Sequence, residues 1–227
     1  GAKSVKVVYL TPNVESIADT ALTSCPNLEE VIVGENDHIS DHGGIILDET
    51  KTKILYWNKN SIGERVVVPE GAQSLPNRFL QGNEKIKELI LPKSLKTIGE
   101  NALKLCLNLE NVDFGGCEVI SKGAFSLSTL KEVDLGDSMK RIEDDAFLKS
   151  SVTKIVFPKS MEYMSPSAFK YCDLEVVEYE GAEYAFNFIK YYFVDLKNVK
   201  YIYGEDDDTA LTKKSKYYKG KNDKSYN

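Results

Sequence analysis

The sequence predicts an α/β solenoid, in which stacked coils each contribute one short strand and one helical turn. Two observations support this fold class. An apolar-x-x-apolar-x-apolar pattern recurs at steps of 21 to 23 residues, with a single longer step of 35 residues. Two further columns, one of isoleucine and one of Ala-Phe pairs, recur in the same phase while the charges between them vary. A unit this small cannot bury its apolar side alone, so the copies must stack on one another.

The strand of each coil is the apolar-x-x-apolar-x-apolar run itself. Such a run, about six residues long, is typical of a strand with one side against a core. The middle apolar position gives one residue per coil, about nine coils in all: Val8, Val31, Val66, Leu89, Val112, Val133, Ile155, Val177 and Val199.

The Ala-Phe segment of each coil is predicted to be a short helical turn on the other side from the strand. In SPSAFKYC, Ser165 is a suitable N-cap and Pro166 suits the first helical position. Because the charges vary while the apolar columns persist, we expect the charged residues to point outward. The apolar column that precedes these turns holds Ile17, Leu75, Ile98, Ile120, Ile142 and Met164.

Two segments interrupt or end the repeat. The long step marks an insert near residues 36–62, and its segment GGIILDETKTKILYW, residues 43–57, has two apolar runs that predict a β-hairpin. Residues 182–203 are predicted to form a C-terminal cap, with an aromatic-rich helix and a last strand. We therefore expect one repeat domain over residues 1–203 and a charged tail over residues 204–227.

The repeats resemble the leucine-rich repeats of the BspA or Treponema type. The lines EVISKGAFSLSTLKEVDLG, MKRIEDDAFLKSSVTKIVFP and MEYMSPSAFKYCDLEVVEY show the resemblance, which covers roughly residues 4–203. It implies a right-handed solenoid with a parallel β-sheet on its concave face. It also implies a bacterial surface or secreted protein that binds other proteins, such as host matrix or surface proteins. The family pattern contains no catalytic residue.

Composition narrows the function classes further. A net charge of −6 argues against nucleic-acid binding, which usually requires a basic surface. No apolar run approaches the ~18 residues that a membrane-spanning helix needs. We expect a monomer without cofactor or metal, secreted or displayed at the cell surface after removal of a leader peptide.

The four cysteines are predicted to be free, buried thiols. Cys25, Cys106 and Cys172 share one interior column, and Cys117 belongs to another. Cysteines of one column are at least two coils apart, and coils about 5 Å apart leave them beyond the ~7 Å Cα separation of a disulfide. A cysteine in such a position behaves as a small apolar residue.

Few other residues suggest chemistry. His38 and His42 could share a metal ion if they lay on a helix, but their segment leads into two glycines. A solvated loop is the expectation, with the metal site as its alternative. Asp113 and Asp134 on neighbouring coils could lie about 5 Å apart, near the spacing of a retaining glycosidase. Because an open sheet has no cleft that excludes water, we expect no enzyme.

The outward side of the strands holds the candidate binding face. Period-2 alternation turns the third and fifth positions of each strand outward. Exposed apolar patches mark contact sites, so we expect an adhesion-type module that binds a protein or a glycan through this concave face. The alternative is a structural spacer without a ligand of its own. The candidate residues are an apolar stripe and an acidic cluster beside it: Tyr9, Ile32, Val67 and Ile90, then Asp113, Glu132 and Asp134.

Overall fold

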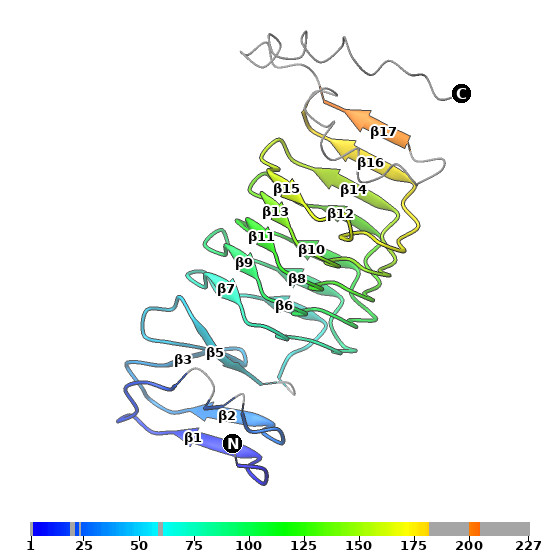
Figure 1. The fold of residues 1–227 in the computed structure, drawn as a ribbon. Helices are drawn as coiled ribbons and strands as arrows, with labels where there is room; N and C mark the ends of the chain where they lie inside the picture. Colours follow the sequence, from blue (N-terminus) through cyan, green and yellow to red (C-terminus); the bar gives the residue numbers. More distant parts are fainter. Residues whose placement is uncertain (1, 19–20, 23, 59–60, 182–199, 205–227) are drawn as a thin grey trace, which may run out of the picture.

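The computed structural model describes residues 2–18, 21–22, 24–58, 61–181 and 200–204. They form an elongated stack of about eight turns, which rises coil by coil from β1 to β17 (Figure 1). All regular elements in these residues are β-strands, and none is a helix. The solenoid and its parallel sheets are confirmed. The α/β class is wrong, because the described coils contain β-structure and turns alone.

One side of the stack is formed by the longer strands, which pair in parallel with their neighbours. They pair residue for residue, as Val66 with Leu89 and Leu89 with Val112. The predicted strand column therefore lies in these strands from Val8 to Val177. The strands form three sheets: β1 (Val7–Leu10) with β2 (Glu30–Val33); β6 (Arg65–Val67), β8 (Glu88–Ile90) and β10 (Asn111–Asp113); and β12 (Glu132–Asp134), β14 (Lys154–Phe157), β16 (Val176–Tyr179) and β17 (Lys200–Tyr203).

A further parallel sheet, which was not predicted from the sequence, lies on another side of the stack. The second residue of every strand in it is buried and belongs to the isoleucine column of the sequence. The first residue of every strand is at least partly exposed. Its five strands have two residues each: β7 (Ser74–Leu75), β9 (Thr97–Ile98), β11 (Val119–Ile120), β13 (Arg141–Ile142) and β15 (Tyr163–Met164).

The Ala-Phe segments form the third side of the stack, the turn side, with turns in place of the predicted helices. In the coil at residues 121–128, the N–H groups of Ala124 and Ser126 donate to carbonyls three residues earlier. The N–H of Phe125 between them donates to the next coil, to the carbonyl of Ala146 at 2.7 Å. Since every second N–H bonds to the next coil, the i to i−4 ladder of an α-helix cannot form.

Residues in the left-handed region close these turns. Leu105, Leu127 and Tyr171 occupy equivalent positions of three coils with φ of 62°, 60° and 62°. A positive φ cannot continue a right-handed helix. The helix predicted to start at Ser165 and Pro166 is therefore wrong, and Ser165 Oγ accepts from the N–H of Ser167 at 3.3 Å within a turn.

Aligned aromatic rings fill the interior between the three sides. Phe125, Phe147 and Phe169 stack in a row, with ring centroids 5.1 and 4.8 Å apart and planes within 6° of parallel. The alanine before each ring is fully buried, as Ala146 is before Phe147. A small side chain at this point leaves room for the rings, which explains why the Ala-Phe pair recurs as a unit.

The insert is an antiparallel sheet that separates two cores, and we call it the partition. The predicted hairpin corresponds to its second and third strands, and a first strand precedes them. Ile45 and Leu47 face the main core, whereas Ile46 between them faces a smaller core shared with β1 and β2. The sheet is therefore an internal wall and not a surface decoration. Its strands are β3 (Ser40–His42), β4 (Ile45–Leu47) and β5 (Ile54–Trp57).

Two side chains fasten the N-terminal strands to the partition. Asn58 Oδ1 accepts from the N–H of Val31 at 2.6 Å, and Asn58 Nδ2 donates to the carbonyl of Val31 at 2.9 Å. The amide thereby takes the hydrogen-bonding groups that a neighbouring strand would use. The Tyr56 hydroxyl donates to the carbonyl of Leu28 at 2.8 Å. As a result, β2 and β6 belong to separate sheets.

The last described strand, β17, changes the predicted register of the final coil. Tyr201 pairs with Val177, so Tyr201 and not Val199 holds the middle position. The step to this coil is thus 24 residues, longer than the regular repeat. The rest of the predicted cap, residues 182–199, and residues 205–227 of the predicted tail lie outside the described residues.

Candidate interaction surfaces

The outward side of the longer strands, from β1 to β17, is called the long-strand face. Its side chains alternate with core residues, because successive side chains of a strand point to opposite sides. On β12, for example, Glu132 and Asp134 are exposed and Val133 is buried. All seven predicted binding residues lie on this face, in β1, β2, β6, β8, β10 and β12.

The apolar residues of this face form two pairs. Tyr9 lies beside Ile32 in register, and Val67 lies beside Ile90. Tyr9 and Val67 are 71% and 49% exposed, and the two isoleucines are half-buried. Because Asn58 takes the bonding groups of Val31 on β2, the pair on β1 and β2 and the pair on β6 and β8 lie in separate sheets.

Two acidic residues of this face also accept hydrogen bonds from the turns that follow their strands. Asp113 Oδ1 accepts from the N–H of Gly115 at 3.0 Å, and Asp134 Oδ1 accepts from the N–H of Gly136 at 3.0 Å. Each carboxylate therefore keeps one oxygen for its own turn and exposes the other to solvent. Glu132 is exposed and lies beside Lys154 in register.

A hollow of about 500 Å³ opens between β10 and β12, and it contains all three acidic residues of the predicted cluster. The two strands are the edges of separate sheets, although they follow each other in the stack (Figure 1). Elsewhere on this face two successive N–H groups donate to the preceding coil, as Lys87 and Glu88 do to the carbonyl of Glu64. Among the described residues no such bond joins β12 to β10, so the hollow coincides with a break in the backbone ladder.

The electrostatic potential of the hollow is negative. Lys154 lies in the hollow, and its pKa is raised mainly by the hydrogen bond to Glu178. The negative charges of Glu132 and Asp134 raise this pKa further. The negative potential extends beyond the hollow. The pKa of Glu180 is raised first by burial, and also by the negative charges of Asp137 and Asp134. A ligand group with positive charge would therefore be favoured here.

The outward side of the short strands, the short-strand face, differs because its charges are paired with one another. Glu118 accepts from Lys96 Nζ at 2.8 Å and from Lys140 Nζ at 2.7 Å, and these bonds lower the pKa of Glu118 to about 2. Beside this ladder the Arg141 guanidinium lies 4.2 Å above the ring of Tyr163. These pairs were not predicted from the sequence. The signal was the alternating sign of the residue that precedes successive short strands.

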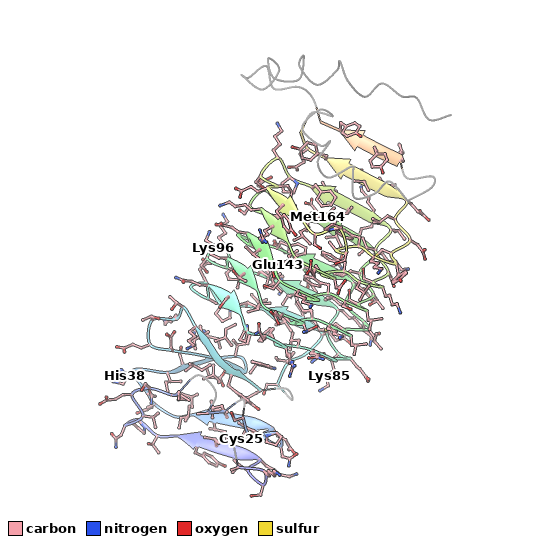
Figure 2. All side chains as sticks on the ribbon, viewed as in Figure 1. Cys25, His38, Lys85, Lys96, Glu143 and Met164 are labelled. Atoms are coloured by element: carbon pink, nitrogen blue, oxygen red, sulfur yellow. The ribbon has the colours of Figure 1, made fainter. Side chains whose placement is uncertain are left out.

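The cysteines match the prediction in part. All four are free. Burial raises the pKa of Cys106 and of Cys117 to about 12, and Cys172 is also buried. Cys25 differs, because it is only half-buried and lies in the N-terminal part of the molecule (Figure 2). The smaller core beside the partition leaves one side of this thiol uncovered.

The two histidines have separate partners. His38 Nδ1 lies 3.2 Å from Glu49 Oε2, and His42 Nε2 lies 3.0 Å from Ser40 Oγ. His42 ends strand β3 and His38 precedes it in a bend, so the helix that a shared metal site required is not formed. Within the described ranges no three potential ligands gather at one point.

Comparison with known proteins gives the family. The model of the BspA type leucine rich repeat region matches residues 53–175, in six copies. No curated protein matches the sequence. The part of the chain that the structure describes contains no helix capable of crossing a bilayer.

Several solved structures share the fold. A leucine rich cell surface protein from Faecalibacterium prausnitzii has a TM-score of 0.67 and 19% identity, and the match covers 81% of this chain and 50% of that one. The pneumococcal vaccine antigen PcpA also has a TM-score of 0.67, with 18% identity over 95% of this chain and 54% of that one. The leucine rich repeat protein of Treponema pallidum has a TM-score of 0.51 and 20% identity, over 67% of this chain and 73% of that one.

The chain thus spans about half the length of the first two of these proteins. At these identities the three similar structures support the fold alone. The match of the repeat model supports membership of the sequence family. That model covers more than half of the chain, in the coils from the partition to β15. The chain therefore belongs to the BspA-type leucine-rich repeat family.

Proposed function

We propose that this protein is an adhesion-type interaction module of a bacterial surface or secreted protein, and that it binds a protein or a glycan through the long-strand face. The observation on which this depends is the composition of that face. Apolar side chains stand exposed at Tyr9 and Val67, and an acidic hollow lies a few coils further along. The paired charges of the short-strand face offer no comparable site.

The chemistry of the hollow favours a partner with a basic group beside an apolar one. Lys and Arg side chains of a protein fit this description, because each has an apolar stem and a cationic end. The exposed carboxylates would steer such a partner by long-range attraction, which salt weakens. The similarly folded protein from F. prausnitzii is a cell surface protein, which supports a partner outside the cell.

A binding screen against immobilised matrix proteins and a glycan array, at low and at physiological salt, would find the ligand. Val67→Ser should then weaken binding at least threefold, and Tyr9→Ser with Val67→Ser should weaken it further. Leu107→Ser is the matched control, because Leu107 is also 49% exposed but lies outside the strands of the long-strand face. It should leave both binding and the thermal transition unchanged.

The acidic part is tested by Asp113→Asn, Glu132→Gln and Asp134→Asn in one variant. Asparagine keeps the oxygen that accepts from Gly115 or Gly136, so the turns remain capped while the charge is lost. Binding should fall and lose its salt dependence. If this variant and Tyr9→Ser with Val67→Ser both bind every ligand as the native protein does, the long-strand face is not the site. If no ligand is found at all, the spacer function gains instead.

A further inference from the structure

A groove of about 770 Å³ lies at the junction between the N-terminal coils, the partition and the first coil of the continuous solenoid. We call it the junction groove. Cys25 and Leu28 line it from the N-terminal side, Tyr56 lines it from the partition, and Asn77 and Arg78 line it from the coil that begins with β7. It belongs to neither the long-strand face nor the acidic hollow, which share none of these residues.

The groove lies where the turn-side ladder has no partner among the described residues. In the later coils turn-side carbonyls accept from the coil before, as Glu100 accepts from Arg78 at 2.9 Å. In the coil that begins with β7, the first of the continuous solenoid, the equivalent carbonyls belong to Asn77, Phe79 and Gln81. Among the described residues no N–H donates to any of the three. The carbonyl of Asn77 lies at the groove, and the other two continue the same open edge.

A proline removes a donor that this edge would otherwise expose. In later coils the residue at this position donates back to the preceding coil, as Gly99 does to the carbonyl of Leu75 at 3.0 Å and Ser121 to that of Ile98 at 3.0 Å. The first coil has Pro76 here, which carries no N–H. At this position the open edge therefore presents no donor, as a proline on the edge of a sheet does.

The charge of the groove points to an acidic ligand. Arg78 is the one charged side chain in its lining, and its guanidinium has no ion pair or side-chain hydrogen bond among the described residues. The other lining residues supply apolar and aromatic surface, with Leu28 and Tyr56 buried in the floor. A guanidinium binds a carboxylate through two parallel hydrogen bonds, which gives both affinity and orientation.

We propose that the junction groove binds a short peptide segment of a partner protein, with an acidic side chain on Arg78. Backbone N–H groups at alternate positions of the segment donate to the carbonyls of Asn77, Phe79 and Gln81. The apolar side chains between them pack on the floor. A strand that adds to an open edge gains affinity from its main chain and specificity from such pockets. The volume is in the range of small-ligand sites, about 300–1,000 Å³.

The test is selection from a phage-displayed linear heptapeptide library on the immobilised protein, followed by fluorescence anisotropy with the selected peptides. Arg78→Asn removes the charge and keeps a residue that tolerates φ of 60°. It should weaken binding at least tenfold. Lys149→Asn is the matched control, because Lys149 is also an exposed turn-side cation, with φ of 53°, and lies outside the groove. Its effect should stay within twofold.

Two further measurements test the place and the bonding. Attachment of pyrene maleimide to Cys25 should block the peptide, since this thiol lines the groove and is the one half-buried cysteine. N-methylation of alternate peptide amides should abolish binding, whereas methylation of the intervening amides should be tolerated. Failure to enrich peptides, equal binding to Arg78→Asn, or binding only of an acidic heparin tetrasaccharide would each overturn the proposal. None of these results bears on the long-strand face.

Discussion

Asn58 offers the sharpest test of how the partition holds the N-terminal coils. Its side chain is 3% exposed, and it satisfies both backbone groups of Val31, itself 1% exposed. Asn58→Ala leaves one buried N–H and one buried carbonyl without a partner. A buried polar group left unpaired costs about 1–3 kcal/mol. The two groups together predict a loss of about 2–6 kcal/mol in the free energy of unfolding.

The loss should concentrate in the smaller core, because Val31 belongs to it and not to the main core. Urea unfolding followed by the fluorescence of Trp57, the single tryptophan, reports on the partition next to the mutation. Hydrogen exchange should accelerate at β2 before it does at β14. Asn108→Ala is the control, since Asn108 is exposed and donates one bond to the carbonyl of Glu84. A loss below about 0.5 kcal/mol for Asn58→Ala, no larger than for this surface control, would refute the reasoning.

Three other predictions concern the core, the charge ladder and the thiols. Phe147→Ala removes the middle ring of the stack and should cost about 3–5 kcal/mol in calorimetry, whereas Phe147→Leu should cost less. The pKa of Glu118 is lowered to about 2 from an ordinary 4.5, so its contribution is present above pH 4.5 and is lost as pH falls toward 2. Urea midpoints of the native protein and Glu118→Gln should therefore differ at pH 6 and converge near pH 2, with a smaller difference in high salt. Ellman's reagent should titrate Cys25 rapidly in the native protein and all four thiols in denaturant, because the raised pKa values of Cys106 and Cys117 keep them protonated.

The repeat itself was predictable because packing fixes its phase. A side chain such as Leu89 must enter the core at the same point in every coil, and this requirement leaves a period in the sequence. The outward positions of the longer strands followed from the same pleat. The residues of the long-strand face could therefore be named, whereas what they bind could not.

The conformation of the turn side left no such period. A helical turn and the observed turns bury the same Ala-Phe pair, so the apolar pattern does not distinguish them. The difference lies in where each N–H donates, and in positive φ at residues such as Leu127 and Tyr171. Leucine and tyrosine give no sequence signal for that conformation, which glycine adopts most readily. The coil-to-coil bonds hold it in place.

The hollow, the groove and the first strand of the partition were beyond the pattern for related reasons. The hollow and the groove lie where coils fail to pair, and a missing backbone bond has no residue type of its own. The polar first strand of the partition, Ser40–His42, shows no apolar run, so it was not recognised. The final register depended on a longer step to Tyr201, which the regular spacing could not reveal.

The phenylalanine stack has a consequence for how the number of coils can change. Phe125, Phe147 and Phe169 repeat at nearly constant spacing and orientation, so each coil presents the same shape to both neighbours. Duplication or deletion of one copy between β8 and β16 would leave every remaining coil with a matching neighbour. A change at the partition would remove a wall whose two faces serve different cores. Copy-number variation is thus expected after the partition, and each event would add or remove one row of outward side chains.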